Sequence, residues 1–355
     1  MLKQIRKFTI DGDPIFCTRF GQGHINETYL VVDSTGRQYI LQKINKLVLT
    51  NPVALMENIV LVTEHLQKSI TEPREALKLV PTYDGKYWIK DVNNDYWRMY
   101  DYISDSICLQ QAHSVNNFYE SAIAFGKFQR QLADFEVDKL NETIPKFHDT
   151  PNRYRLFKNA LKSNVCGRVK DVQKEIDFVI AREEYSKTLM NLYLNNKLPL
   201  RVTHNDTKLN NVLFDRFTRK ALCVIDFDTV MPGFSVNDFG DSIRFGASTA
   251  AEDECDLRKV EISLPLFESY TEGFLAVCGE DLNNCEIEYL CDGAKMMTLE
   301  CGVRFLTDYL LGDVYFRTHR IRHNLDRCRT QFKLVRDMEN KWEAMQNIVT
   351  RRAGK

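Results

Sequence analysis

Two polar segments near the middle of the chain constrain its fold more than any other feature of the sequence. The first segment runs from Asp206 to Asn211, and the second begins at Asp226, twenty residues after Asp206. Two short apolar runs, at 212–214 and 222–225, separate them. This order predicts a β-hairpin that brings Asp226 beside the segment from Asp206 to Asn211.

The residue types in these segments are typical of phosphoryl transfer. The first segment fits the pattern H-x-D-x-x-x-x-N, in which the aspartate engages the attacking hydroxyl and the asparagine holds a metal ion. Asp206 is therefore the candidate catalytic base, and Asn211 and Asp226 are the candidate Mg²⁺ ligands beside the phosphates of ATP. Lys208 is expected to reach the transferring phosphate as a point charge. His204 is interpreted as a residue that fixes the loop backbone by hydrogen bonds.

A glycine-containing turn lies in a β-rich N-terminal region. The runs at 15–20, 28–32 and 38–44 have the composition of strands. Gly21 and Gly23 lie in the turn after the first run, where the absence of side chains lets backbone amides approach a phosphate. Because such turns are common in hairpins, this nucleotide-binding prediction is weak when taken alone.

Lys43 lies on the third of these strands, where a phosphate-binding lysine is expected. Glu57 is its candidate ion-pair partner, in competition with Glu64. Both glutamates lie on a helix predicted to begin at Asn51, because Asn is a good N-cap and Pro52 suits the first helical position. A solvated surface lysine and an unrelated helix glutamate form the alternative interpretation.

The region around Met99, Tyr100 and Tyr102 ends the last predicted strand, and it is the candidate hinge that receives adenine. The alternative, which the sequence supports equally, is that these residues form an ordinary buried end of a strand with no contact to a nucleotide. Beyond residue 104 the pattern is mostly helical, with a buried stripe over 118–132 and a further long helix predicted over 171–194. The expected fold is α+β: a protein-kinase-like two-lobed fold with a small β-rich N-terminal lobe and a larger, mainly helical C-terminal lobe.

The bulk properties agree with this interpretation. A chain of 355 residues exceeds what one compact core usually supports, so two lobes are expected, at 1–103 and 104–355. The formal net charge of −1, without basic patches, argues against nucleic acid and membrane surfaces as partners. The ten cysteines occur singly, the first residues lack the apolar run expected of a signal peptide, and no apolar run of about 18 residues occurs. These features predict reduced thiols and a cytoplasmic location, and they leave the oligomeric state open.

Taken together, these residues resemble the aminoglycoside phosphotransferase and choline kinase superfamily over nearly the whole chain. Within that superfamily they are similar to the N-acetylhexosamine 1-kinase group. The strings that carry the resemblance are residues 23–29, 40–45, 204–215, 225–233, 238–244 and 304–310.

The resemblance implies transfer of the γ-phosphate of ATP, with Mg²⁺, to the anomeric hydroxyl of N-acetylglucosamine or N-acetylgalactosamine. It implies that the acceptor lies at Asp206 and is contacted by His24 and Arg304, with Tyr315 as a further candidate. Lys43 departs from this group, in which an arginine is expected. Either cation neutralises phosphate, but only arginine binds it bidentately.

Several residues have a second interpretation. Arg304 and Asp308 are four residues apart in a helical segment, so they can form a purely structural ion pair. One of Asp238 and Asp241 is expected to order the catalytic loop. The acidic residues at 252–254 fit a helix surface better than a binding site for a cationic acceptor.

Other functions stay open on the sequence alone. Kinases of the same superfamily that act on choline, homoserine or an aminoglycoside are alternatives, because acidic and aromatic residues are available to bind a cation. A nucleotide-binding pseudokinase that regulates a partner would be expected to lack Asp206, Asn211 or Asp226, and all three are present.

Overall fold

The computed structural model describes residues 1–21, 25–112 and 114–354, which form two compact units. Each unit is built from three stretches of the chain, whereas the sequence-based boundary at 103/104 gives each lobe one continuous stretch. Unit 1 comprises residues 1–108, 134–145 and 212–232, and unit 2 comprises residues 109–133, 146–211 and 233–355.

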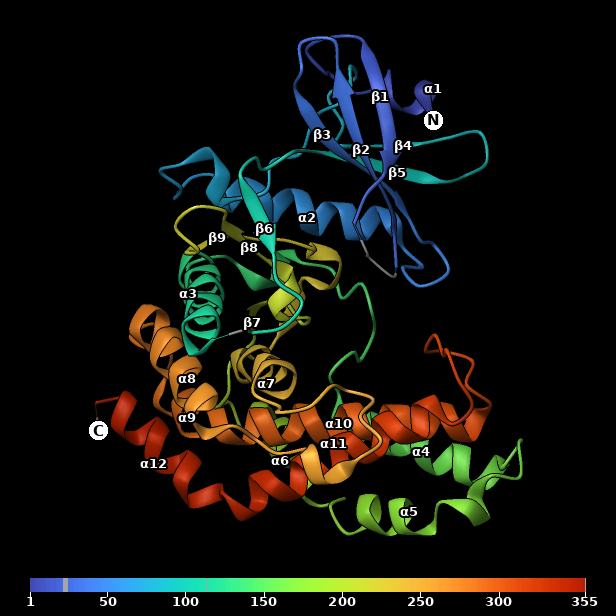
Figure 1. Ribbon diagram of the computed structural model, residues 1–355, viewed down its shortest axis with the longest axis vertical. Coiled ribbons are helices and arrows are strands. Elements are labelled where there is room, and N and C mark those ends of the chain that lie inside the picture. The colour runs from blue at the N-terminus through green and yellow to red at the C-terminus, as the bar shows by residue number, and fades with distance from the viewer. Residues whose placement is uncertain (22–24, 113, 355) are drawn as a thin grey trace. The chain divides into compact units, whose positions relative to one another are not determined.

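Unit 1 contains a five-stranded antiparallel sheet with the order β1-β2-β3-β5-β4 (Figure 1). Its strands are β1 (Pro14–Arg19), β2 (Glu27–Asp33), β3 (Gln38–Ile44), β4 (Trp88–Lys90) and β5 (Tyr96–Asp101). A second sheet of three strands has the order β6-β8-β9, with β6 (Ser106–Cys108), β8 (Val212–Asp215) and β9 (Ala221–Val224). The helices of this unit are α1 (Leu2–Ile5) and α2 (Pro52–Leu66).

Side chains of the five-stranded sheet alternate between its two faces, as they must in extended strands. Tyr39 and Leu41 of β3 and Trp97 and Met99 of β5 are buried on one face in a hydrophobic cluster that also contains Phe8. The even-numbered residues of β3 and β5 therefore lie on the opposite face.

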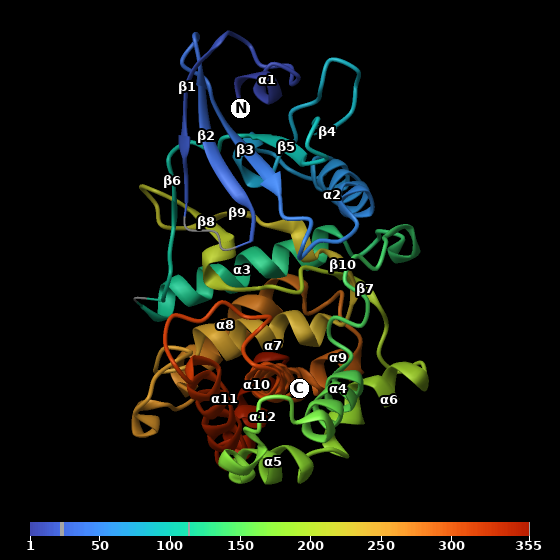
Figure 2. The ribbon, with the colours of Figure 1, turned by 90° about the vertical axis from the view of Figure 1, so that its right-hand side faces the viewer.

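Helix α2 begins where the sequence predicts. The side chain of Asn51 accepts a hydrogen bond from the backbone amide of Ala54 at 3.2 Å, and Pro52 occupies the first helical position. The cap satisfies one of the amides that have no partner at a helix start. Figure 2 shows α2 beside the five-stranded sheet of this unit.

The hairpin predicted between the two polar segments is present as β8 and β9. Val212 and Val224 are register partners in this antiparallel pair. Asn211 directly precedes β8 and Asp226 follows β9 by two residues. The residues that enter and leave the hairpin thus flank the same end of it.

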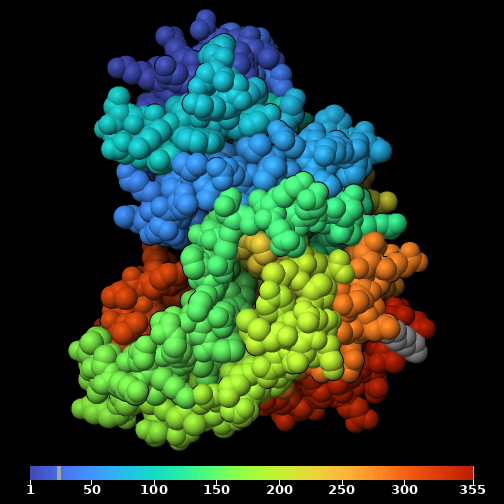
Figure 3. All heavy atoms as spheres, turned by 180° about the vertical axis from the view of Figure 1, so that it is seen from behind, coloured from blue at the N-terminus to red at the C-terminus, as the bar shows by residue number. Residues whose placement is uncertain are grey.

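Unit 2 is mainly helical. Its helices are α3 (Val115–Gln131), α4 (Thr150–Ser163), α5 (Gln173–Ile180), α6 (Thr188–Leu194), α7 (Ser235–Gly246), α8 (Leu264–Cys278), α9 (Asn284–Glu288), α10 (Leu290–Leu311), α11 (His323–Asn340) and α12 (Trp342–Arg352). Its short strand β7 spans Arg201–Thr203, and β10 (Met231–Gly233) runs across the boundary between the units. Figure 3 shows the segment from α4 to α6, in green to yellow-green, covering one face of this unit. No helix in the described part of the chain has the length and apolar character to cross a bilayer.

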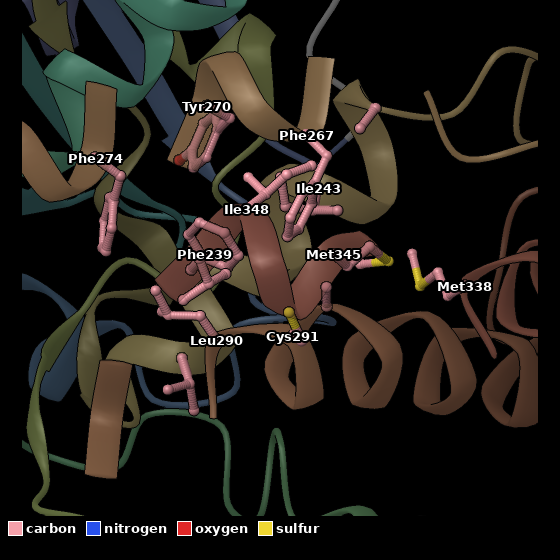
Figure 4. Close-up of a cluster of buried hydrophobic side chains, with 14 of the residues drawn as sticks. Phe239, Ile243, Phe267, Tyr270, Phe274, Leu290, Cys291, Met338, Met345 and Ile348 are labelled. Atoms are coloured by element: carbon pink, nitrogen blue, oxygen red, sulfur yellow. The ribbon is translucent and has the colours of Figure 1, made fainter. Parts of the chain in front are cut away.

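A large hydrophobic core holds α7 in place. Phe239 and Ile243 of α7 are fully buried against Phe267, Tyr270 and other residues of α8, α10, α11 and α12 (Figure 4). Burial of side chains of this size is the main stabilising contribution to such a core. Because α7 carries Asp238 and Asp241, this packing also positions the polar groups described below.

Two glycines set the close contact between α7 and α10. A Cβ atom on Gly240 would lie 2.3 Å from the carbonyl oxygen of Gly293, and one on Gly293 would lie 2.0 Å from the carbonyl oxygen of Val236. The helix backbones therefore meet directly at this crossing, and any larger residue would separate the helices.

The long helix predicted over 171–194 is not continuous. Helix α5 ends at Ile180, and α6 begins at Thr188. Between them, Arg182 stacks on the ring of Phe178 at 3.6 Å and its Nη2 pairs with Glu339 at 2.6 Å. The side chain of Arg182, between the two helices, thus makes a tertiary contact with α11.

Candidate active site

The predicted catalytic loop follows β7 in unit 2, and its polar side chains contact one another. The Oδ1 atom of Asp206 lies 2.7 Å from Nζ of Lys208. The Nδ2 atom of Asn211 donates to Oδ2 of Asp206 at 3.0 Å and to its backbone carbonyl at 2.8 Å. Three of the residues predicted from the sequence therefore form one cluster, centred on the Asp206 carboxylate.

These contacts keep Asp206 ionised. Burial acts to raise the pKa of Asp206, but the charge and hydrogen bond of Lys208 and the hydrogen bond of Asn211 outweigh it, so the pKa is lowered. Burial acts to lower the pKa of Lys208, and the Asp206 carboxylate more than compensates, so that pKa is raised. An ionised carboxylate next to a fixed cation is suited to accept a hydrogen bond from a substrate hydroxyl.

Asp238 of α7 orders the backbone of this loop. Its carboxylate accepts hydrogen bonds from the backbone amides of His204 and Asn205, each at 2.8 Å, and from Nε2 of Gln129 at 2.9 Å. Asp238 is 2% exposed, and burial raises its pKa to about 7. Asp241 instead pairs with Arg244 at 2.7 Å. Of the two candidates, Asp238 is the residue that orders the loop.

Further contacts fix the same loop. The ring of His204 is buried, with its centroid 5.5 Å from that of Phe125, and its backbone amide is bonded to Asp238. The Ser242 hydroxyl donates to the carbonyl of Thr207 at 2.7 Å. The loop therefore has both an apolar and a hydrogen-bonded support, as a preorganised catalytic group requires.

The two predicted metal ligands carry oxygen atoms of the type that a hard divalent ion prefers. The hydrogen bonds of Asn211 to Asp206 use its Nδ2, so Oδ1 is the atom left to accept. Asp226 adopts left-handed backbone angles, φ 68° and ψ 64°, a conformation that costs a non-glycine residue on the order of 1–3 kcal/mol and is concentrated at functional sites. In the described ranges no three His, Cys, Asp or Glu side chains gather as a metal site.

The predicted pairing of Lys43 with Glu57 is wrong. Nζ of Lys43 lies 2.6 Å from Oδ2 of Asp95 and 5.8 Å from the centroid of the Trp97 ring. Glu57 is exposed on α2 and accepts a hydrogen bond from Asn141 at 3.0 Å. The physical reason is strand alternation, which puts Lys43 on the same face as Trp97, its register partner on β5.

A buried ion pair that the sequence analysis missed lies elsewhere in unit 1. Arg98 of β5 is 1% exposed, and its Nη2 is 2.6 Å from Oδ1 of Asp228, itself 3% exposed. Its Nε donates to Oε1 of Gln42 at 2.9 Å. Burial acts to lower the pKa of Arg98, but the carboxylates of Asp228 and Asp226 help to raise it. The side-chain amide of Asn26 also donates to Asp228.

The glycine turn and the hinge are only partly described. Gly23 and His24 lie outside the described residues, and Gly21 has a positive φ of 75° that favours glycine. Phe20 contacts Tyr102 edge to face, with ring centroids 6.0 Å apart. Met99 is buried in the hydrophobic cluster of the sheet, and Tyr100 lies on the other face with Arg98. The roles of these residues toward a nucleotide stay predictions.

A buried polar network connects the catalytic loop of unit 2 to α10. Nε2 of His148 lies 3.3 Å from the carbonyl oxygen of Asn205, and its Nδ1 lies 2.8 Å from Oε1 of Glu300. The hydroxyl of Thr150 donates to the other oxygen of Glu300 at 2.7 Å. Burial acts to raise the pKa of Glu300, but His148 and the nearby arginines outweigh it, so the pKa is lowered.

Arg304 lies one helical turn beyond Glu300 and does not form the pair with Asp308 that was one interpretation of the sequence. Asp308 accepts hydrogen bonds from the backbone amides of Val314 at 3.0 Å, Tyr315 at 2.8 Å and Phe316 at 3.0 Å. The guanidinium of Arg304 lies 5.5 Å from the ring centroid of Phe316 and 5.2 Å from that of Phe147. Tyr315 is 62% exposed, and Asp308 fixes its backbone.

The acidic residues at 252–254 lie in a loop, so the expected helix surface is wrong. Each of the three is already paired. Glu252 pairs with Arg244 and Arg327, Asp253 pairs with Arg320 and His323, and Glu254 pairs with Lys259.

The residues missed from the sequence are Arg98, Asp228, His148 and Glu300. For Arg98 a signal was present, because a charged residue between Trp97 and Met99 in an apolar strand must find a buried partner. His148 and Glu300 are 152 residues apart, and no local pattern relates them.

Comparison with known proteins places the fold. Among solved structures, the aminoglycoside phosphotransferase from Alicyclobacillus acidocaldarius is 13% identical with a TM-score of 0.63, and the match covers 100% of this chain and 96% of that chain. A microcompartment-associated aminopropanol kinase is 14% identical with a TM-score of 0.61, covering 97% of each chain. The amicoumacin kinase hAmiN in complex with AMP-PNP, Ca²⁺ and Ami is 14% identical with a TM-score of 0.57, covering 92% of this chain and 88% of that chain. These likenesses confirm the predicted kinase-like fold.

Comparison of the sequence with family models identifies the family as well as the fold. The family model described as "Phosphotransferase enzyme family" matches residues 17–272, which is most of the chain. The chain therefore belongs to the phosphotransferase enzyme family.

Proposed function

We propose that this protein is an ATP-dependent kinase that phosphorylates the anomeric hydroxyl of an N-acetylhexosamine, N-acetylglucosamine or N-acetylgalactosamine, to give the 1-phosphate. Family membership and the cluster around Asp206 support the kinase part of this proposal. The observation that carries the choice of acceptor is the state of Arg304. Its guanidinium is held between aromatic rings, and within the described ranges it has no carboxylate at ion-pair distance.

In the proposed reaction, Asp206 accepts the proton of the sugar hydroxyl as that oxygen attacks the γ-phosphorus, and the bond from this phosphorus to the bridging oxygen breaks so that ADP leaves. Its lowered pKa means that it orients the hydroxyl by a strong hydrogen bond and takes up the proton late, as the new bond forms. Lys208 balances the Asp206 charge and offers an ammonium group toward the transferring phosphate. Positioning and charge neutralisation provide most of the rate enhancement in phosphoryl transfer.

Asn211 and Asp226 are the residues that would hold Mg²⁺. The amide oxygen of Asn211 and the carboxylate of Asp226 are of the type that a hard ion prefers. When bound, the ion neutralises the negative charge of the nucleotide phosphates. Within the protein, the hydrogen bonds from Asn211 hold the Asp206 carboxylate in one orientation.

The charges around the catalytic loop of unit 2 favour a neutral acceptor over a cationic one. The Glu300 carboxylate is fully buried and occupied by His148 and Thr150, and the acidic residues at 252–254 are paired with basic side chains. Arg304, one helical turn beyond Glu300 on α10, instead has a guanidinium with no carboxylate at ion-pair distance among the described residues. An arginine donates several hydrogen bonds to hydroxyl and carbonyl oxygens, such as those of an acetamido sugar, and it repels an ammonium group.

Homoserine is the strongest alternative acceptor, because its carboxylate would suit Arg304. Burial and the charge of Arg304 lower the pKa of Arg153, so a second guanidinium lies near the first. Choline and aminoglycosides carry cationic ammonium groups, which a pair of guanidinium groups repels. A pseudokinase that binds nucleotide without turnover is the alternative outside enzyme function.

The test is ADP release with Mg²⁺ and ATP against a panel of acceptors: N-acetylglucosamine, N-acetylgalactosamine, glucose, galactose, choline, homoserine and kanamycin. The proposal expects turnover on the two acetamido sugars. Turnover on homoserine, choline or kanamycin would keep the kinase chemistry and reject the sugar. Nucleotide binding with no turnover on any acceptor would favour the pseudokinase.

A further inference from the structure

The two faces of the sheet in unit 1 carry different basic residues. Lys43 lies on the face of Trp97 and pairs with Asp95 at 2.6 Å. The neighbouring residue Gln42 lies on the opposite face, where Arg98 is its register partner on β5. Because side chains alternate between the two faces of a strand, Lys43 of β3 and Arg98 of β5 lie on opposite faces of the sheet.

The face of Arg98 is also the face of the segment that follows Asp226. A row of hydrogen bonds crosses three strands on this side: Nε of Arg98 donates to Oε1 of Gln42 at 2.9 Å, and Nε2 of Gln42 donates to the hydroxyl oxygen of Thr28 on β2 at 3.1 Å. Nη2 of Arg98 then reaches Asp228 at 2.6 Å. Asp228 lies two residues after Asp226, the proposed metal ligand.

One arm of the Arg98 guanidinium, Nη1, has no hydrogen-bond partner in the part of the chain that the structure describes. This nitrogen is buried. Nearly all buried polar groups in proteins have a partner, so a buried donor without one needs an explanation. A ligand with acceptor oxygens, bound next to Asp226 and Asp228, would provide it.

We propose that Arg98, and not Lys43, is the basic residue of unit 1 that binds the phosphates of the nucleotide. Gln42 and Asp228 hold two arms of its guanidinium, and Nη1 donates to a phosphate oxygen. This inference rests on the proposed function, because it needs a nucleotide as ligand. Arginine binds phosphate through a fixed, planar set of donors, and such charge-assisted hydrogen bonds are stronger than those between neutral groups.

Binding of adenosine, ADP and ATP to the full-length protein with Mg²⁺, measured by isothermal titration calorimetry, tests the proposal without an acceptor. Arg98→Gln is expected to weaken ADP and ATP binding by about tenfold to hundredfold and to leave adenosine binding within about twofold. Lys43→Gln is expected to leave all three affinities within about twofold. Lys46→Gln is the matched control, because Lys46 also pairs with Asp95, at 3.0 Å, and is more exposed.

Removing Arg98 leaves Asp228 buried without its partner, so the single variant needs a folding control. Thermal unfolding identifies a variant that has lost its structure. Arg98→Gln combined with Asp228→Asn removes both charges and is expected to recover stability but not ADP affinity. Arg98→Lys keeps the charge and is expected to fold. Relative to wild type, this variant is expected to lose at least several-fold more affinity for ADP than for adenosine.

Three results would overturn the proposal. The first is loss of ADP affinity in Lys43→Gln with no loss in the folded Arg98 variants. The second is equal weakening of adenosine and ADP in the folded Arg98 variants, which would make Arg98 purely structural. The third is a wild-type protein that binds none of the three ligands, and that result rejects the proposed kinase function itself.

Discussion

The carboxylate of Asp238 accepts a hydrogen bond from the backbone amide of Asn205 at 2.8 Å, directly before Asp206 in the chain. Asn205 has a positive φ of 61°, which is uncommon for a residue other than glycine. The bond to Asp238 compensates for that conformation and fixes the backbone from which the Asp206 side chain projects. Asp238 is thus a positioning residue that need not touch substrate.

Asp238→Asn is expected to lower kcat by about ten- to hundredfold, because one carboxylate oxygen becomes an amide group that cannot accept from a backbone amide. ADP affinity should change by less than about twofold. Steady-state kinetics and calorimetry check the two effects separately. Asp256→Asn, which removes a carboxylate from a surface pair with Arg258, is the control and should behave as wild type. A fully active Asp238→Asn variant would contradict the positioning role.

The burial of Asp238 also predicts a pH dependence of stability. Burial raises its pKa in the folded protein to about 7, above the ordinary carboxyl value. Its contribution to stability is therefore fully present below the unfolded-state pKa and is lost as the pH rises through about 7. Between about pH 5.5 and about pH 8, the free energy of unfolding of wild type should fall by about 2 kcal/mol relative to Asp238→Asn. Urea unfolding at several pH values measures this difference, and parallel profiles for the two proteins would disagree with it.

Asp206→Asn is expected to abolish phosphoryl transfer and to leave ATP binding nearly intact. The amide keeps the shape of the side chain, but it cannot accept the proton of the acceptor hydroxyl. A stopped assay for ADP release gives the rate, and calorimetry gives the affinity. A rate within about tenfold of wild type, a margin of about 1.4 kcal/mol in the activation free energy, would refute the role of Asp206 as base.

Arg304→Ala is expected to raise the KM for the acceptor by about tenfold or more, with the KM for ATP unchanged, because the side chain is assigned to the sugar and not to the nucleotide. Arg336 provides a matched control. Its guanidinium lies 4.9 Å from the ring centroid of Phe178, so Arg336→Ala removes a comparable contact between an arginine and an aromatic ring. If both variants change the KM for the acceptor equally, the effect is one of general stability. If neither does, the assignment of Arg304 is wrong.

The sequence was informative where the structure depends on local order along the chain. The hairpin between Asn211 and Asp226 follows from two apolar runs and a turn, and the start of α2 follows from Asn51 and Pro52. The partners of Asp206 within the same loop, Lys208 and Asn211, also lie close by in sequence.

Contacts that depend on tertiary packing could not be predicted in the same way. The face on which Lys43 lies is set by the register of β3 against β5 and by the cluster around Trp97. Spacing along the sequence does not contain this information, so it predicted the wrong ion-pair partner for Lys43. The Arg98–Asp228 pair joins residues 130 positions apart in the chain. A one-residue shift in strand register would exchange the two faces, and the sequence pattern near Lys43 does not fix that register.

The most direct test of the central claim is the position of the phosphate in the product formed from ATP and N-acetylglucosamine labelled with ¹³C at C1. The expected product has lost its reducing end and shows a ¹³C–³¹P coupling at the labelled carbon, as a 1-phosphate requires. A product that keeps its reducing end and carries phosphate on another hydroxyl would contradict the assignment of the anomeric hydroxyl. Transfer to homoserine or choline with none to the sugar would contradict the choice of acceptor and leave the kinase chemistry in place.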